Sequence, residues 1–273
     1  MFRNKSVTLL LFGLILLASC SKYKTLLKSN NYELKLEKAI EYYNKTDYYK
    51  AMQLLEELVP YYRGTQNSEK VNYYYAYCYY RMGDNILASY YFKRFAIEFP
   101  NSKYAEECFY MNAYTKYLDS PIYTLDQTSS YEAIKELQLF INYYPQSDSL
   151  ERCNELIDKL RYKLQKKDFE ISRLYYKTEN YLAAITSFKN VLKDYPDTKF
   201  KEEILFLIVK TYYYYAFNSI RKKQTERYSN TINAYREFAV AFPESTFLKE
   251  ANGYYENSLN ELKILSEQPI KNK

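Results

Sequence analysis

Apolar and polar residues follow each other along this chain with the period of amphipathic helices, and one arrangement of small and bulky positions occurs five times. In each copy a small or short side chain is followed four and seven residues later by bulky ones, a spacing that places all three on one stripe of a helix. The small positions are Ala51, Ala88, Ala133, Ala184 and Thr231. The bulky pairs are Leu55 and Leu58, Phe92 and Phe95, Leu137 and Phe140, Phe188 and Val191, and Tyr235 and Phe238. We expect neighbouring helices to approach closely at the small positions.

A helix stop follows twelve residues after each small position. The first stop is Tyr62-Arg63-Gly64-Thr65, and the others read aromatic-Pro-x-Ser/Thr: Phe99 to Ser102, Tyr144 to Ser147, Tyr195 to Thr198 and Phe242 to Ser245. Because proline ends a helix, we expect one helix to end there and the hydroxyl to cap the next helix, for about 1 kcal/mol.

The order of small, aromatic and proline anchors is similar to the tetratricopeptide repeat, a helical hairpin of about 34 residues. The second copy has Ala76, Tyr79, Ala88, Phe92 and Pro100 at the spacing of that family. We therefore predict an all-α fold, a tetratricopeptide-like helical-hairpin superhelix of about five repeats over residues 32–265. An ordinary helical bundle with chance periodicity is the alternative, which five concordant anchors disfavour.

Inserted material separates some of the stops, which lie 37, 45, 51 and 47 residues apart. We expect a polar loop over Leu118–Thr128 and one long helix over Leu150–Tyr176. Arg221–Gln224 is expected to form an exposed basic joint. A last helix, about Thr246–Leu265, would cap the repeats before a flexible tail at 266–273.

The N-terminus predicts export and lipid anchoring. Two basic residues precede an apolar run of 11 residues, Val7–Leu17, which is typical of a secretory signal and shorter than the roughly 20 residues of a spanning helix. Leu16–Cys20 resembles the lipobox of bacterial lipoproteins. That resemblance implies removal of residues 1–19, acylation of Cys20, and a lipidated tether over 20–31. By the same resemblance to bacterial lipoproteins, Ser21 after the cysteine and the lack of a following acidic cluster imply the outer membrane and its periplasmic face. The alternative is an unmodified thiol behind an ordinary signal.

Composition narrows the function classes. Without Arg3 and Lys5 of the signal, 37 basic residues face 33 acidic ones, and this mild charge of +4 with interspersed signs does not indicate nucleic-acid binding. The chain has 37 Tyr, 15 Phe, no Trp and only 4 Gly, which argues against β-sandwiches and barrels.

Three cysteines remain in the predicted mature chain: Cys78, Cys108 and Cys153. Each falls within an apolar helical pattern, which favours buried free thiols. A Cys78–Cys108 disulfide between neighbouring helices is the alternative.

Catalysis is not indicated. The chain has no His and no glycine-rich phosphate loop. Its paired acids, such as Glu106-Glu107, lie at helix starts or on polar faces and point about 100° apart on a helix, so they do not face one substrate. We predict no enzyme, no cofactor and no metal site.

The first helices of such repeats carry the candidate binding site. Transferring the family's inward-facing positions gives, in the second and third repeats, Lys70, Tyr73, Tyr77, Tyr80, Arg81, Tyr110, Tyr114 and Tyr117. Tyrosine offers a large contact area with a polar tip, which suits peptide recognition. The alternative is that this stripe packs against neighbouring repeats.

A lipobox, a short tether and five such repeats together resemble the BamD family of outer membrane assembly lipoproteins. Phe99–Glu106 and Leu125–Thr128 carry the most specific resemblance, and Arg63-Gly64 and Thr231 depart from the pattern. The resemblance implies two partners. Later repeats would bind the POTRA region of a BamA-like insertase, and earlier ones would bind unfolded outer-membrane β-barrel precursors.

A different class also fits the pattern. A repeat lipoprotein could bridge the outer membrane to peptidoglycan or to a division complex. A glycan-binding lipoprotein would use Trp platforms, and this chain has no Trp.

Overall fold

The computed structural model describes residues 22–267, and every regular element within that range is a helix. A short helical segment over 22–27 precedes the labelled helices. These are α2 (Tyr32–Asn44), α3 (Tyr48–Tyr61), α4 (Asn67–Met82), α5 (Asn85–Glu98), α6 (Ala105–Leu118), α7 (Thr128–Tyr143), α8 (Leu150–Lys177), α9 (Tyr181–Asp194), α10 (Lys201–Phe217), α11 (Arg221–Ala241) and α12 (Leu248–Glu267). The predicted all-α fold is confirmed.

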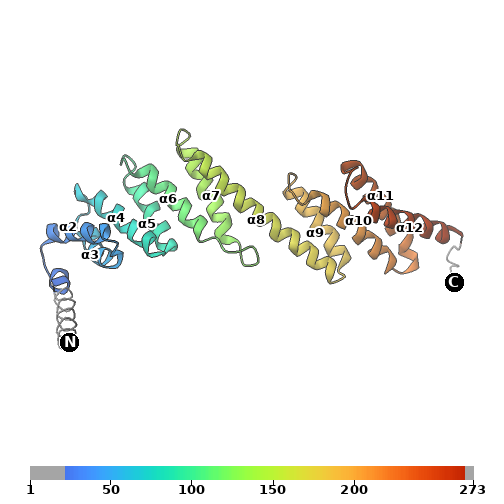
Figure 1. Cartoon of the computed structure of the whole chain (residues 1–273), viewed down its shortest axis with the longest axis horizontal. Helices are drawn as coiled ribbons and strands as arrows, with labels where there is room; N and C mark the ends of the chain where they lie inside the picture. Colours follow the sequence, from blue (N-terminus) through green and yellow to red (C-terminus); the bar gives the residue numbers. More distant parts are fainter. Residues whose placement is uncertain (1–21, 268–273) are drawn as a thin grey trace, which may run out of the picture. The chain divides into compact units, whose positions relative to one another are not determined.

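Helices that follow each other in the chain pair as hairpins (Figure 1). The pairs are α2–α3, α4–α5, α6–α7 and α10–α11, and α12 packs on α10 and α11. The fifth pair, α8–α9, is joined by the rings of Phe169 and Phe188 and by a hydrogen bond of 2.7 Å between Ser172 and Ser187. These are the five tetratricopeptide-like repeats that the stop positions predict, followed by the predicted last helix.

The predicted anchors lie in the core. All five small positions have no exposed surface, as at Ala88, Ala184 and Thr231. The bulky partners are at most 2% exposed, except Tyr235, which is partly buried. The stripe of each second helix therefore fills the space between helices, and its small residue lets the neighbour approach.

The four aromatic-proline stops share one geometry. Their aromatic residues end helices with φ between −124° and −137° and ψ between 58° and 73°. The predicted cap after them is wrong in detail, because each next helix begins three residues after the hydroxyl. Ser102, for example, accepts the N–H of Tyr104 at 3.1 Å, and the equivalent bond recurs at the other three stops. The hydroxyl closes the turn that precedes the helix.

The first stop has another geometry. Tyr62 ends α3 with φ −87° and ψ 4°, and Gly64 has a φ of +77°, in the left-handed region that favours glycine. The departure of Arg63-Gly64 from the aromatic-proline pattern therefore corresponds to a different turn.

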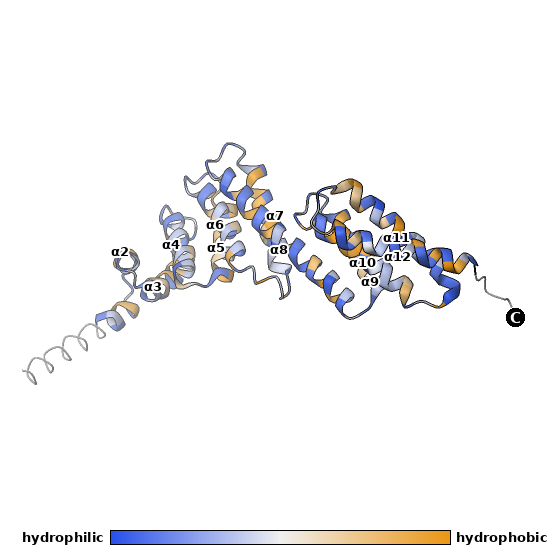
Figure 2. Cartoon of the chain, turned by 45° about the vertical axis from the view of Figure 1, so that its right-hand side comes forward, coloured by the Kyte–Doolittle hydropathy of each residue, from blue (hydrophilic) through white to orange (hydrophobic). Residues whose placement is uncertain are grey.

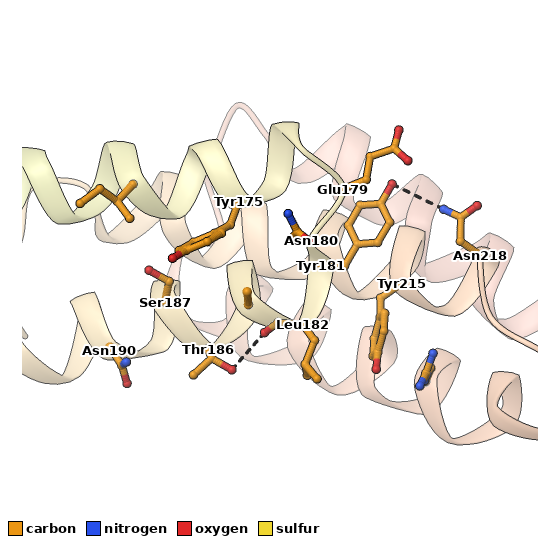
Figure 3. Close-up of a pocket in the computed structure, with 13 residues that line it drawn as sticks. Tyr175, Glu179, Asn180, Tyr181, Leu182, Thr186, Ser187, Asn190, Tyr215 and Asn218 are labelled. Atoms are coloured by element: carbon orange, nitrogen blue, oxygen red, sulfur yellow. Dashed lines mark hydrogen bonds between the residues drawn. The ribbon is translucent and has the colours of Figure 1, made fainter.

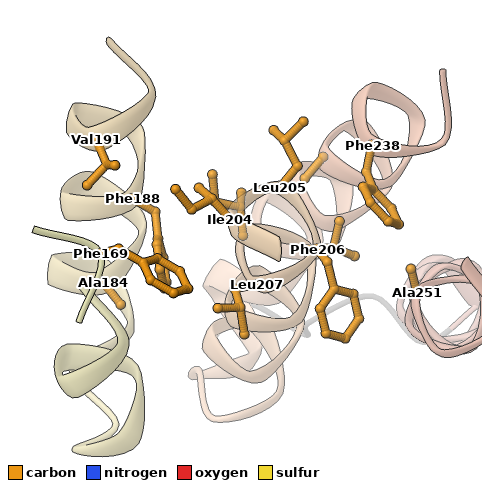
Figure 4. Close-up of a cluster of buried hydrophobic side chains, with 13 residues drawn as sticks. Phe169, Ala184, Phe188, Val191, Ile204, Leu205, Phe206, Leu207, Phe238 and Ala251 are labelled. Atoms are coloured by element: carbon orange, nitrogen blue, oxygen red, sulfur yellow. The ribbon is translucent and has the colours of Figure 1, made fainter. Parts of the chain in front are cut away.

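The chain divides into two compact units. Among the described residues, the first comprises 22–121 and 126–157, and the second comprises 122–125 and 158–267. In the first unit, one cluster of buried side chains lies around Leu54, Leu55 and Leu58, and another lies around Phe92 and Phe95. In the second unit one cluster joins α8 through α12 and contains Phe169, Phe188 and Phe238 (Figure 4).

The inserts are mostly as predicted. The loop between α6 and α7 is confirmed, and so is the long helix, since α8 has 28 residues. The prediction of a basic joint between helices is wrong, because Ile220 is extended and α11 starts directly after it, so that Arg221–Gln224 forms its first turn. The side chains of residues 221–223 are exposed, as expected. The last helix reaches Glu267, so the predicted tail contributes its first two residues to α12.

The N-terminal predictions are tested only in part. The signal, Cys20 and the tail beyond residue 267 lie outside the described residues. Within the predicted tether, residues 22–27 are helical and Tyr23 is only 8% exposed, so this part packs against the first hairpin.

The three cysteines Cys78, Cys108 and Cys153 are buried and free, as predicted. The alternative Cys78–Cys108 disulfide is not formed. Burial raises the pKa of the Cys78 thiol to about 12 and that of Cys153 to about 11. Native protein should therefore react slowly with thiol reagents.

Candidate functional site

The predicted tyrosine stripe begins on α4, where Tyr73 and Tyr77 face the next hairpin. Tyr77 is 8% exposed and its hydroxyl donates to the Glu107 carboxylate. The half-buried Tyr73 donates to the same oxygen at 3.0 Å, and its ring centroid lies 4.4 Å from that of Tyr104. Both side chains thus join the second hairpin to the start of α6.

Burial raises the pKa of Tyr73 and of Tyr77 well above the ordinary value, and the neighbouring Glu107 carboxylate raises both further. Both phenols are therefore protonated donors under physiological conditions. For Tyr77, the geometry agrees with the alternative interpretation, packing between repeats.

The remaining predicted residues of α4 are more accessible. Tyr80 is half-buried on Phe92, and the exposed Arg81 guanidinium lies 5.6 Å from the Tyr80 ring centroid. A hydrogen bond with Tyr43 of the first hairpin raises the pKa of Arg81. Lys70 is exposed and lines a separate hollow of about 390 Å³ against α2. The structure therefore does not gather the five predicted α4 residues at one point.

Tyr110, Tyr114 and Tyr117 form a ladder of half-buried rings along α6. Successive rings are nearly parallel, with centroids 5.8 and 6.2 Å apart and interplanar angles of 11° and 16°. Tyr110 also packs edge-on against Phe140 of α7. This ladder is the part of the predicted stripe in which several rings are arranged alike and stay partly accessible. Peptide binding there remains a prediction.

A hollow in the second unit was not predicted. It is an open groove of about 1050 Å³. Its side chains come from the end of α8, from α9, from the end of α10 and from α11 (Figure 3). Prominent among them are Ile171, Tyr175, Tyr181, Leu182, Tyr215 and Arg227.

The groove combines apolar surface with fixed polar groups. Leu182 is 60% exposed and Tyr175 is 41% exposed, so apolar area is available to a partner. The Arg227 guanidinium lies 3.8 Å from the Tyr215 ring centroid and donates to Ser219, which holds this charge in place. Asn218 donates to the Tyr181 hydroxyl at 3.5 Å. Exposed apolar side chains beside an oriented charge are features of protein-interaction surfaces.

Sequence reasoning missed the groove because no motif unites its residues. The one signal was Leu182, a large apolar residue two positions before the small Ala184 and hence off the buried stripe. In three other repeats the residue two positions before the small one is also large and more than half exposed: Tyr49, Ile86 and Tyr131.

No group of three or more His, Cys, Asp or Glu side chains that could hold a metal occurs among residues 22–267. Nor does any helix in this part of the chain have the length and apolar character to cross a membrane. Hydrophilic and hydrophobic residues are mixed along the helices (Figure 2).

Comparison with known proteins adds the family. The family described as "YfiO: Outer membrane lipoprotein" matches residues 30–227, which is most of the chain and covers nine of the helices completely. The chain belongs to this family. The predicted resemblance to the BamD family is thereby confirmed.

Two curated proteins are similar to this YfiO-family chain. The "Outer membrane protein assembly factor BamD" of Caulobacter vibrioides is 28% identical over 130 residues, which are 48% of this chain and 43% of the relative. The "Putative outer membrane protein assembly factor BamD" of Aquifex aeolicus is 25% identical over 208 residues, 74% of this chain and 66% of the relative. The matches thus span less than two thirds of either relative.

Proposed function

We propose that this protein is a lipid-anchored scaffold of β-barrel assembly on the periplasmic face of the outer membrane. Acylated Cys20 would hold it to the membrane. The family match over most of the chain is the observation that carries the proposal. Both relatives named above are assembly factors by name, which supports a binding role without catalysis.

Two surfaces are available for two partners. The ladder of Tyr110, Tyr114 and Tyr117 would take the aromatic-rich ends of unfolded barrel precursors, because flat rings with polar edges accept varied side chains. The groove of the second unit would receive the POTRA region of a BamA-like insertase. Its exposed Leu182 and the oriented Arg227 provide an apolar centre with a charge at its edge.

Site-specific photo-crosslinking tests this division. A photoreactive residue at Tyr114 should capture barrel precursors, and one at Leu182 should capture the insertase. Ile97 is the matched control, since it is 66% exposed on α5 and belongs to neither surface. Depletion of the protein should lower the amounts of assembled barrel proteins.

The competing hypothesis has its own signature. Crosslinks to cell-wall or division proteins, with barrel levels unchanged on depletion, would sink the assembly role. They would establish instead a lipoprotein that bridges the outer membrane to peptidoglycan or a division complex.

A further inference from the structure

The segment that precedes α2 is docked on the first hairpin. The Tyr23 hydroxyl lies 2.9 Å from Oε1 of Gln53 and 3.2 Å from the carbonyl oxygen of Lys50, both on α3. Its ring packs edge-on against Tyr42 at 5.5 Å. Residues 22–28, which we name the strap, are therefore fixed at their beginning.

A buried lysine fixes the end of the strap. Lys35 of α2 is 2% exposed, and its ammonium group donates to the carbonyl oxygen of Leu27 at 2.8 Å. It also pairs with Glu57 of α3, which balances the buried charge. Leu26 and Leu27 pack on the core between these two points. The strap is thus held at both ends and along its apolar side.

Because the strap is docked, only a short connection remains between Cys20 and the first hairpin. Only Ser21 and Lys22 separate Cys20 from Tyr23, and three residues of extended chain span at most about 10 Å. The headgroup layer of one leaflet is about 5–8 Å thick. An acyl group on Cys20 would therefore bring Tyr23 to the level of the headgroups or just beyond them.

The strap has the charge for that position. Lys22, Lys24 and Lys28 are exposed, and residues 21–31 include no acid. The nearby Asp47 and Glu57 are paired with Lys50 and Lys35, so they do not neutralise the strap. At physiological salt, the screening length of electrostatic interactions is about 8 Å, which is comparable to the span between Cys20 and Tyr23.

An exposed tyrosine lies beside the strap. Tyr49 is 60% exposed, and its hydroxyl accepts from Nε2 of Gln53, the residue whose Oε1 contacts Tyr23. Tyrosine is enriched at membrane interfaces because its ring is apolar and its tip polar.

From this geometry we infer that the strap lysines Lys22, Lys24 and Lys28, together with Tyr49, form a surface that lies against anionic phospholipid headgroups. The inference rests on acylation of Cys20, a part of the proposed function, and is independent of the insertase and precursors. The strap would then fix one end of the first hairpin at the bilayer surface, where each lysine strengthens contact about fivefold.

The full chain, lipidated in a bacterial host and reconstituted into vesicles, tests the inference. A dye is attached to Tyr49→Cys or to the control Tyr61→Cys, and quenching by nitroxide-labelled headgroups is measured. Both positions are tyrosines on α3, 60% and 53% exposed, and about 18 Å apart along the helix. The native Cys78, Cys108 and Cys153 are buried and should not take up dye.

On vesicles containing phosphatidylglycerol, quenching at position 49 should exceed that at position 61 severalfold. The triple variant Lys22→Glu, Lys24→Glu, Lys28→Glu should reduce this difference, as should high salt, while Tyr23→Ala should abolish it by freeing the strap. Because the three lysines are exposed, the triple variant should unfold like the wild type.

Equal quenching at the two positions, or a difference that the triple variant leaves unchanged, would overturn the inference. The mass of the N-terminal peptide reports acylation separately, and an unmodified Cys20 would overturn the inference together with lipid anchoring. Failure of barrel assembly with the quenching pattern intact would refute only the proposed partners.

Discussion

Glu136 of α7 shows how one polar side chain can hold neighbouring helices together. It is 6% exposed, and its carboxylate accepts from Asn112 of α6 at 2.8 Å and from Lys93 of α5 at 2.6 Å. The side-chain oxygen Oδ1 of Asn112 in turn accepts a hydrogen bond from the Ser89 hydroxyl at 2.9 Å. A buried network of this kind stabilises only when every member has a partner.

Replacing Glu136 by Ala should therefore lower the free energy of unfolding by about 1–3 kcal/mol, because Asn112 and Lys93 lose their acceptor. Glu132→Ala is the matched control. This substitution also removes a carboxylate of α7 that pairs with a lysine, Lys116. Because Glu132 is 56% exposed, its loss should lower the free energy of unfolding by less than about 1 kcal/mol. Urea unfolding followed by circular dichroism measures both, and equal costs would contradict the role of the network.

At the scale of elements, the hairpins depend on close approach at one small residue in each second helix. Ala184 of α9 has no exposed surface and lies in the core with Phe169 and Phe188, whereas its neighbour Ala183 is exposed and lines the groove. The two alanines differ in environment and in little else.

Ala184→Leu should destabilise the protein by about 1–3 kcal/mol, because the added methylenes have no space in a packed core. Ala183→Leu should change stability by no more than about 0.5 kcal/mol. Thermal unfolding compares the pair. If Ala183→Leu proved as costly as Ala184→Leu, the helix would be packed on a different face.

The sequence was sufficient for this element but not for every site. Ala184 could be predicted because its spacing to Phe188 and Val191 repeats in all five copies. The strap could not, because lysine is normally exposed and the burial of Lys35 depends on Glu57, 22 residues away. The groove could not either, since four helices supply it and no local pattern relates them. Tyr77 was ambiguous because tyrosine serves packing and recognition equally well.

The whole molecule combines many buried phenols with an absence of histidine. Burial raises the pKa of Tyr23, Tyr176 and Tyr228 to about 12 each, from the ordinary value near 10. In the unfolded chain these phenols lose their protons first as the pH rises. The folded state then binds more protons than the unfolded one, so stability falls with increasing pH.

We therefore expect the unfolding midpoint to vary little between about pH 6 and 8, where no His titrates, and to fall above about pH 10. Urea unfolding at a series of pH values measures this. If the urea midpoint instead increased as the pH was raised beyond 10, the buried tyrosines would ionise more easily in the folded protein than in the unfolded chain.

The groove also has an optical consequence. Tyr175, Tyr181 and Tyr215 line it, and the chain contains no tryptophan. Excited tyrosines pass their energy efficiently to a nearby indole, so a tryptophan brought by a partner would emit at the expense of these rings. Binding of a tryptophan-containing partner in the groove can thus be followed in solution with unmodified protein, by a shift of the fluorescence emission from tyrosine to tryptophan wavelengths.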